Sequence, residues 1–272
     1  MTEPKPGYTR AVQPLAPTAM TTDDGDLDTG DIRIPVADGE IPAFHARPKA
    51  AGPHPVVIVV HEIFGLHEYI RDVCRRLAGA GYFCVAPDLY QRHGDVTKIP
   101  DIWGIISTVV EKVPDEQVFA DLDATVAWAA ASPHADTARL GITGFCWGGR
   151  IVWAYSAHHP GLRAGVAWYG RLVGSGPLVP GGVALPRTYP IDVAGRLHGP
   201  VLALFGDQDK SIPLPTIEQM RSALAAAGDP SELVIYPGAD HGFHADYRPT
   251  YDKPAATYAW KLARDWLKER GV

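Results

Sequence analysis

The sequence predicts an α/β fold: a doubly wound, mostly parallel sheet with helices on both faces and an antiparallel hairpin at its N-terminal end. Two observations support this prediction. Short runs of β-branched and aromatic residues alternate with longer segments in which apolar residues recur at helical spacing. Repeated strand–helix units of this kind require parallel strands with helices packed on both sides. The 272 residues, 46% of them hydrophobic, suffice for one large core.

Residues 1–30 are polar and rich in Pro and Asp, so we expect an irregular N-terminal arm there. Disorder is an equally good interpretation of its first half. Residues 31–272 are expected to form a single domain. It begins with the strands Asp31–Val36 and Ile41–Arg47, which flank turn residues 37–39 and so predict the antiparallel hairpin.

The next elements alternate between strand and helix. The continuous β-branched run in Pro55–His61 is typical of a strand buried on both faces. Apolar residues from Ile70 to Ala78 recur at helical spacing. Further strands are expected at Tyr82–Pro87, Arg139–Thr143, Ala164–Tyr169, Val201–Gly206 and Leu233–Tyr236, and further helices at Asp115–Ser132, from about Trp147, at Pro215–Ala227 and at Pro254–Glu269.

One segment fits neither pattern. Arg171–Gly199 is rich in Gly and Pro and is too long for a plain connection, which indicates a functional lid or disorder.

The composition excludes several classes of protein. With 25 basic and 31 acidic residues the net charge is −6, which argues against a nucleic-acid partner. The longest purely aliphatic run, Val56–Val60, is far shorter than a membrane-spanning helix, and the N-terminus lacks the features of a signal peptide. Three scattered cysteines do not form a disulfide framework. We therefore expect a cytoplasmic protein without a membrane partner.

The stretch Gly144–Gly149 (GFCWGG) lies between an expected strand and an expected helix and has the G-x-nucleophile-x-G pattern of a nucleophile elbow. Side chains two positions before or after the nucleophile would collide in such a sharp turn. The turn places the Cys146 sulfur at a helix N-terminus, whose partial positive charge favours a thiolate. We expect Cys146 to be the nucleophile, whereas Cys74 and Cys84 fall in apolar periodicity and are expected to be core residues, the ordinary role of a free cysteine.

An elbow nucleophile needs a general base and an acid that orients it, and on sheets of this kind the acid comes first in the chain. Asp209 follows the strand Val201–Gly206, and His241 follows Leu233–Tyr236. We expect His241 to be the base, with Asp209 fixing its tautomer and stabilising the imidazolium. Asp207 is the weaker candidate for the acid, and either aspartate could instead be a turn or capping residue.

His61-Glu62-Ile63 follows the first parallel strand, where such sheets form half of the oxyanion hole. The backbone N–H groups of Ile63 and Trp147 are expected to hold the developing oxyanion, and one such donor contributes about 10²–10³ in rate. Glu62 would then lie near the sulfur. The alternative for Glu62 is a surface carboxylate at the end of a strand.

The motifs HEIFG, PDLYQRHGD, GFCWGGR, FGDQDKSIP and DHGF, in this order and spacing, resemble the dienelactone hydrolase family of α/β hydrolases from about Asp31 to the C-terminus. The resemblance implies the α/β-hydrolase fold and a Cys146–His241–Asp209 triad. It also implies that Glu62 hydrogen-bonds the resting thiol and helps to activate it when substrate arrives. The implied reaction is hydrolysis of an enol-lactone, such as 4-carboxymethylenebut-2-en-4-olide to maleylacetate, through an acyl-enzyme and without a cofactor.

The resemblance also implies a site for the substrate carboxylate. Type members of the family use two arginines, and Arg92 matches the first. The position of the second is Ala245; Arg248 is nearby but not aligned, and Arg171 is a further candidate. We also expect Tyr169 and Phe243 to bind substrate. A neutral or larger ester, and thus a general carboxylesterase, stays open as the alternative.

Other classes of protein fit less well. A zinc hydrolase would need HExxH, and Gly65 stands in place of the second histidine, so no metal is expected. A redox thiol protein would need a resolving cysteine near Cys146. A non-catalytic binding protein on the same fold would not need the ordered Cys, Asp and His. We expect a monomer or homodimer whose partner is a small lactone or ester.

Overall fold

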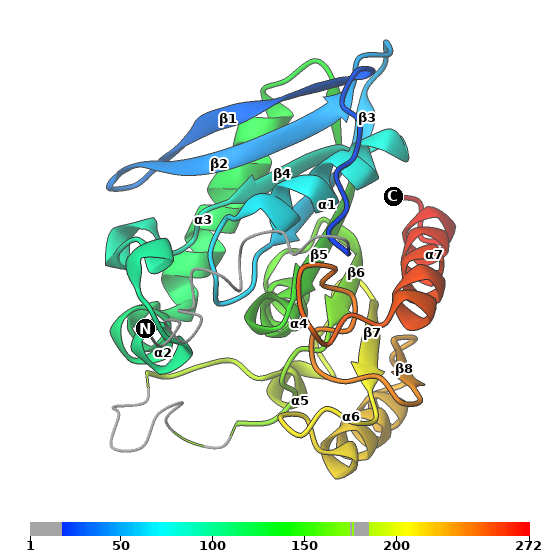
Figure 1. Cartoon of the computed structure of the whole chain (residues 1–272). Coiled ribbons are helices and arrows are strands. Elements are labelled where there is room, and N and C mark those ends of the chain that lie inside the picture. Colours follow the sequence, from blue (N-terminus) through cyan, green and yellow to red (C-terminus); the bar gives the residue numbers. More distant parts are fainter. Residues whose placement is uncertain (1–17, 175, 177–184) are drawn as a thin grey trace.

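The computed structural model describes residues 18–174, 176 and 185–272, and the first half of the expected N-terminal arm lies outside these residues. Eight strands form one sheet in the order β1-β2-β4-β3-β5-β6-β7-β8 (Figure 1). Their bounds are β1 Leu27–Val36, β2 Gly39–Pro48, β3 His54–Val60, β4 Phe83–Pro87, β5 Ala135–Phe145, β6 Leu162–Trp168, β7 Val201–Gly206 and β8 Glu232–Tyr236. The pairs β1–β2 and β2–β4 are antiparallel and all others parallel, which confirms the predicted sheet and hairpin.

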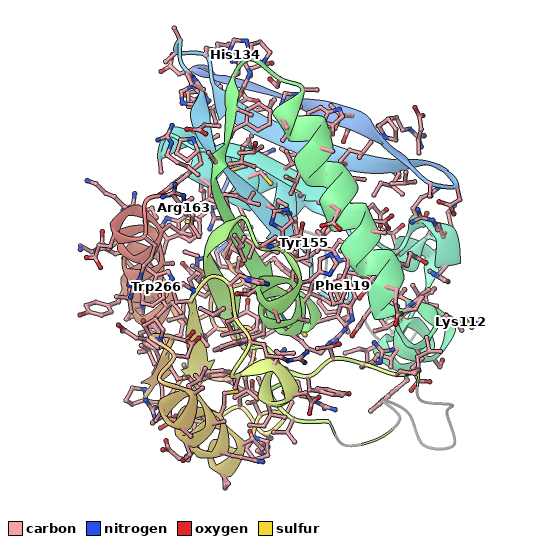
Figure 2. The ribbon with its side chains drawn as sticks, turned by 180° about the vertical axis from the view of Figure 1, so that it is seen from behind. Lys112, Phe119, His134, Tyr155, Arg163 and Trp266 are labelled. Atoms are coloured by element: carbon pink, nitrogen blue, oxygen red, sulfur yellow. The ribbon has the colours of Figure 1, made fainter. Side chains whose placement is uncertain are left out.

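The helices are α1 Glu68–Gly79, α2 Ile102–Thr108, α3 Asp115–Ala130, α4 Trp147–His158, α5 Pro190–Val193, α6 Leu214–Ala227 and α7 Lys253–Glu269. Helix α1 lies in front of the sheet in Figure 1, and α3 lies in front of it in Figure 2, which is seen from behind. Helices α3 and α4 cover the same face, since the Tyr155 hydroxyl donates to Asp123 at 2.8 Å. Helices therefore cover both faces, as the strand–helix alternation predicts.

The core follows the predicted periodicity. All five residues Val56–Val60 of β3 are inaccessible to solvent, as are Ile70, Val73 and Cys74 of α1. Burying each large aliphatic side chain contributes about 1.5–3 kcal/mol. The longest aliphatic run thus lies in a strand that is packed by helices on both faces.

Three features differ from the sequence-based expectation. Strand β1 begins at Leu27, so the last four residues of the expected arm are strand. Helix α2 was not predicted; it has seven residues, capped by Asp101, whose side chain accepts the Gly104 N–H. In the segment Arg171–Gly199, the short helix α5 and the fully buried Leu172 pack against the domain, whereas residues 177–184 lie outside the described residues.

The register of the parallel strands determines where the candidate residues meet. Val60 of β3 lies opposite Gly144 of β5, and Phe145 lies opposite Trp168 of β6. Gly206 of β7 pairs with Tyr236 of β8. The residues that follow these strands therefore lie along one edge of the sheet, where open α/β sheets bind their ligands.

Candidate active site

Cys146 occupies a strained turn between β5 and α4. Its φ is 54° and its ψ −111°, a conformation that costs a residue with a side chain about 1–3 kcal/mol. A Cβ at Gly144 would lie 2.4 Å from the Gly148 carbonyl oxygen, and one at Gly148 would lie 2.5 Å from that of Val60. Only glycine fits at these two positions. The turn places Cys146 at the N-cap of α4, partly exposed to solvent.

His241 lies in the loop after β8 and is hydrogen-bonded to Asp209 in the loop after β7. Its Nδ1 is 2.7 Å from Oδ2 of Asp209. The aspartate side chain is 1% exposed and the histidine 23% exposed. The other carboxylate oxygen of Asp209 accepts hydrogen bonds from the N–H and the hydroxyl of Ser211, at 2.8 and 2.6 Å. Both oxygens of the Asp209 carboxylate therefore take part in hydrogen bonds. Because Nδ1 of His241 faces Asp209, Nε2 of the ring is left for another partner.

Cys146 and Asp209 both affect the protonation of His241. Burial lowers the pKa of His241, but the charge of Cys146 and hydrogen bonds with Asp209 and Cys146 outweigh burial and raise the pKa to about 10. Burial also acts to raise the pKa of Asp209, yet its hydrogen bonds with His241 and Ser211 hold that pKa below the usual value. The arrangement favours the protonated form of His241. A histidine whose pKa is raised in this way is a suitable acceptor for a thiol proton.

The sequence predicts that the backbone N–H groups of Ile63 and Trp147 form the oxyanion hole. In the described part of the chain, no hydrogen bond is found from either group. The contact of Gly148 with the carbonyl oxygens of Val60 and His61 brings the start of α4 against the end of β3. The His61 ring stacks on the Trp147 indole at 5.7 Å. These contacts bring the end of β3, which precedes Ile63, close to Trp147.

Glu62 is fully buried, not a surface carboxylate. Its Oε2 accepts a hydrogen bond from the Tyr247 hydroxyl at 2.5 Å and lies 3.3 Å from Nε2 of His67. Its Oε1 lies 3.7 Å from the Arg248 guanidinium. Burial acts to raise the pKa of Glu62, but His67, Arg248 and Tyr247 hold it below the usual value. Among the described residues, its hydrogen bonds come from Tyr247 and His67 and not from the resting Cys146 thiol, contrary to the expectation.

Arg92 is not placed to bind a substrate, which corrects the expectation drawn from the resemblance. Its guanidinium forms two-pronged ion pairs with Asp38, at 2.6 and 2.7 Å, and with Asp121, at 2.7 and 3.0 Å. These bonds use Nε and both terminal nitrogens. They tie the β1–β2 turn to α3, so the structure gives Arg92 a structural role.

Arg92→Met should therefore reduce stability and not substrate selectivity. It would leave the Asp121 carboxylate, 2% exposed, without its partner, which costs about 3 kcal/mol. Urea unfolding measures this loss. Arg221→Met, which removes an exposed ion pair with Glu218, should change stability by less than about 0.5 kcal/mol. A selective rise in KM for carboxylate-bearing esters over neutral ones in Arg92→Met would restore the original assignment.

Tyr169 and Phe243, the other expected substrate contacts, are both fully buried. The Tyr169 ring meets the His241 ring edge-on at 5.1 Å, and Phe243 packs against Tyr169 at 5.6 Å. Tyr169 thus packs against His241 and Phe243 packs against Tyr169, and neither side chain is exposed to solvent. Tyr169 has a φ of 37°, so the chain turns sharply there, directly after β6.

Several residues that contact the site were not predicted from the sequence. Tyr247 and His67 hold Glu62, and Ser211 holds Asp209. The Ser211 contact could have been predicted, because an aspartate side chain often accepts a hydrogen bond from the backbone N–H two residues later. No local sequence pattern indicates the Tyr247 contact, since 185 residues separate Tyr247 from Glu62.

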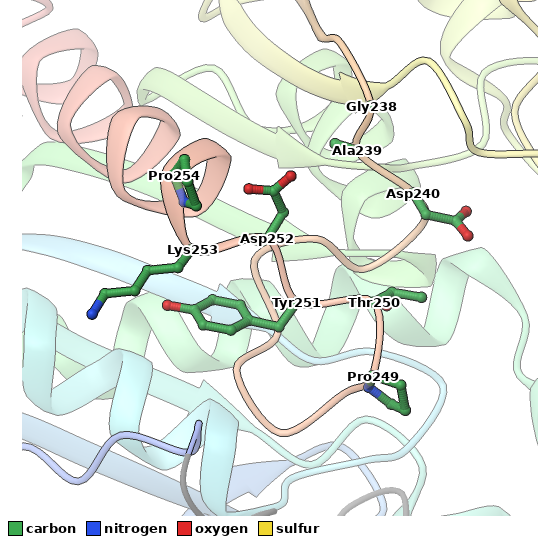
Figure 3. Close-up of a pocket in the computed structure, with 9 residues that line it drawn as sticks. All are labelled: Gly238, Ala239, Asp240, Pro249, Thr250, Tyr251, Asp252, Lys253 and Pro254. Carbon is green, nitrogen blue, oxygen red and sulfur yellow. The ribbon is translucent and has the colours of Figure 1, made fainter.

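A surface hollow lies beside the His241 loop, lined by residues 238–240 and 249–254 (Figure 3). Cys146, Asp209 and His241 are not among its lining residues. Asp252 in its wall accepts the Ala255 N–H and so caps α7. Within residues 18–174, 176 and 185–272, no cluster of three or more His, Cys, Asp or Glu is arranged to hold a metal, and no helix has the length and apolar character needed to cross a membrane.

The chain is similar to known proteins over most of its length. A model described as "Dienelactone hydrolase family" matches residues 41–271. The chain is 54% identical over 267 residues to the "Putative carboxymethylenebutenolidase" of Methylorubrum extorquens, which covers 98% of this chain and 90% of that protein. It is 32% identical over 228 residues to the "Probable 2-oxo-3-(5-oxofuran-2-ylidene)propanoate lactonase" of a Bradyrhizobium species, covering 83% of this chain and 88% of that protein.

A solved structure has the same fold as this chain. The crystal structure of a "Putative Dienelactone Hydrolase" from Klebsiella pneumoniae superposes with a TM-score of 0.84 at 50% identity. The match covers 89% of this chain and 99% of that chain.

Proposed function

This chain belongs to the dienelactone hydrolase family and is a hydrolase of esters or lactones; we propose that it cleaves an enol-lactone or activated carboxylic ester through an acyl-enzyme on Cys146. The observation that carries the proposal is the His241 imidazole, bonded at Nδ1 to the buried Asp209 and interacting with Cys146 on its other side. This arrangement supplies a nucleophile, a base and an orienting acid together.

The reaction follows in two steps. The Cys146 sulfur attacks the carbonyl carbon while His241 holds the thiol proton, and the N–H groups of Ile63 and Trp147 stabilise the oxyanion. The C–O bond breaks, and His241 donates the proton to the leaving oxygen. A water then loses a proton to His241 and attacks the thioester, which releases the acid and restores the thiol. Asp209 stabilises the imidazolium in both steps.

The thiol nucleophile favours activated substrates. When the tetrahedral intermediate collapses, either the thiolate or the substrate's own leaving group departs. An enolate or phenolate competes well with a thiolate, whereas an amine or a simple alkoxide does not. The Bradyrhizobium relative is named as a lactonase for such an enol-lactone. We therefore assign enol-lactones and activated esters, and not peptides, as the substrate class.

Glu62 completes the proposed centre. It stays ionised, because His67, Arg248 and Tyr247 stabilise its negative charge. Once its side chain turns toward the sulfur, this ionised carboxylate can accept a hydrogen bond from the Cys146 thiol and so help His241 to remove the thiol proton. In the structure Glu62 holds Tyr247 and Arg248, which follow His241 in the same loop, so it also positions that loop.

A general carboxylesterase for neutral esters is the second candidate. One observation favours it: the Arg92 guanidinium, expected to bind the substrate carboxylate, is already neutralised by Asp38 and Asp121.

A substrate panel tests the proposed function. It consists of 4-carboxymethylenebut-2-en-4-olide, p-nitrophenyl esters of increasing chain length and a p-nitroanilide of the same acyl group. We expect turnover of the lactone or the activated esters and none of the anilide. Anilide turnover at a rate similar to that of the esters would contradict the mechanism, and so would the absence of any ester or lactone turnover.

A further inference from the structure

The side chain of His61, which lies between β3 and Glu62, makes two hydrogen bonds that fix its tautomer. Nδ1 of the ring is 2.7 Å from the Glu62 carbonyl oxygen, and Nε2 is 3.1 Å from the backbone nitrogen of Leu89, just after β4. A carbonyl oxygen only accepts hydrogen bonds, and a backbone N–H only donates them. The ring therefore carries its proton on Nδ1 and a lone pair on Nε2.

Burial keeps this ring neutral. The His61 side chain is inaccessible to solvent. Burial lowers the pKa of His61 and outweighs the charge of Asp88, which acts to raise it. A protonated ring would turn an N–H at Nε2 toward the Leu89 N–H, and the second hydrogen bond would be lost. The neutral ring with its proton on Nδ1 is thus the form that fits these surroundings.

The hydrogen bond from Nδ1 sets the orientation of the peptide between Glu62 and Ile63. In a trans peptide the C=O and the N–H point in opposite directions. The Glu62 carbonyl oxygen accepts from His61 at 2.7 Å and from the Gly65 N–H at 3.3 Å. These two bonds therefore direct the Ile63 N–H away from the His61 ring. In the described part of the chain, no hydrogen bond is found from this N–H.

The other expected oxyanion donor belongs to a residue that the same ring contacts. The His61 ring stacks on the Trp147 indole, with the ring centroids 5.7 Å apart and the planes inclined by 15°. A Cβ at Gly148 would lie 2.6 Å from the His61 carbonyl oxygen, so the start of α4 lies directly against this residue. The Tyr90 ring meets the histidine ring edge-on at 4.6 Å. His61 therefore joins the segment of Ile63 to the segment of Trp147.

We propose that His61 is a positioning residue, which orients the Ile63 N–H toward the oxyanion by donating from Nδ1 to the Glu62 carbonyl oxygen. This inference rests on the proposed hydrolase function, because the oxyanion forms when Cys146 attacks a carbonyl carbon. His61 acts through the peptide that follows Glu62 and takes no part in making or breaking bonds. Since the ring holds the backbone of Glu62 and not its carboxylate, that side chain can turn toward the sulfur without moving the donor.

The ratio of two rate constants of Cys146 tests this role. Acylation by p-nitrophenyl hexanoate, measured as p-nitrophenol released in a single turnover, passes through an oxyanion. Exchange with 2,2′-dipyridyl disulfide, in which the thiolate attacks sulfur and releases 2-thiopyridone, does not. In His61→Leu the ratio of acylation to exchange should fall by about 10- to 100-fold, since a misdirected donor loses most of its contribution. General damage to the site would lower both rate constants, so an unchanged ratio overturns the proposal.

Matched variants separate the hydrogen bond of His61 from its packing. In His61→Asn the side-chain amide keeps a donor near the position of Nδ1, whereas in His61→Gln the amide reaches the position of Nε2. The ratio should stay within about threefold of wild type in His61→Asn and fall about tenfold or more in His61→Gln. These variants replace His61→Leu if it does not fold, and equal ratios in the two would contradict the proposal. His45→Leu is the control, because the His45 ring contacts Phe83 and Trp128 instead, and it should keep the wild-type ratio.

Nitrogen NMR of the wild-type protein separates failure of this inference from failure of the proposed function. At neutral pH the His61 signals, assigned by their loss in His61→Asn, should show a protonated Nδ1 and an unprotonated Nε2. A protonated Nε2 refutes the inference, whether or not the protein is a hydrolase. The expected tautomer without any acylation of Cys146 would instead refute the proposed function.

Discussion

Cys146→Ala should lower kcat for activated esters by about 10⁴-fold or more, because it removes the atom that forms the acyl-enzyme. The remaining site could only polarise the carbonyl and position water. Initial rates with p-nitrophenyl esters under saturating conditions measure this loss. The fold should persist, since Cys146 is partly exposed and its strained φ of 54° is no easier for cysteine than for alanine.

The other two cysteines provide matched controls. Cys74 and Cys84 are fully buried, and burial raises the pKa of both thiols. Cys74→Ala and Cys84→Ala should leave kcat within about threefold of wild type, although each removes some core packing. Near-wild-type turnover by Cys146→Ala would place the nucleophile elsewhere.

The second large effect concerns the general base. His241→Ala should lower kcat by about 10³- to 10⁴-fold, because thiol deprotonation and leaving-group protonation both pass through this ring. Combined with Cys146→Ala, it should cause little further loss, since residues that act as a unit are not additive.

Two further variants complete this test. One is Asp209→Asn, and the other, His158→Ala, changes an exposed histidine. Asp209→Asn should also lower kcat strongly, because the amide cannot stabilise the imidazolium as a carboxylate does. His158→Ala is the control: its ring contacts Asp123, on the outer side of α3 and α4. A His241→Ala enzyme with an unchanged rate would mean that another group is the base.

Most of the fold could be predicted because the informative residues are local. The strand β3 and the helix α1 each carry a periodic pattern that is buried in the structure as expected. The elbow could be predicted for the same reason: Gly144 and Gly148 lie within two residues of Cys146, and both are required by close backbone contacts. Helix α2, with seven residues, is too short to show a period.

The charge balance of the site could not be predicted from the sequence. Arg92 matches a motif, yet its partners Asp38 and Asp121 lie 54 and 29 residues away and cancel its charge only in the folded chain. Glu62 similarly meets Tyr247 and Arg248 through the fold alone. Whether an arginine is free to bind an anion depends on every carboxylate around it, and no local pattern records that.

The central claim, that the Cys146 sulfur carries the acyl group, is tested most directly by mass spectrometry of the enzyme quenched in acid during turnover of a p-nitrophenyl ester. We expect the added acyl mass on the peptide that contains Cys146 and on neither of the peptides with Cys74 and Cys84. His241→Ala should acylate more slowly. Acylation of another residue, or turnover without any acyl adduct even when deacylation is slowed by low pH, would contradict the account.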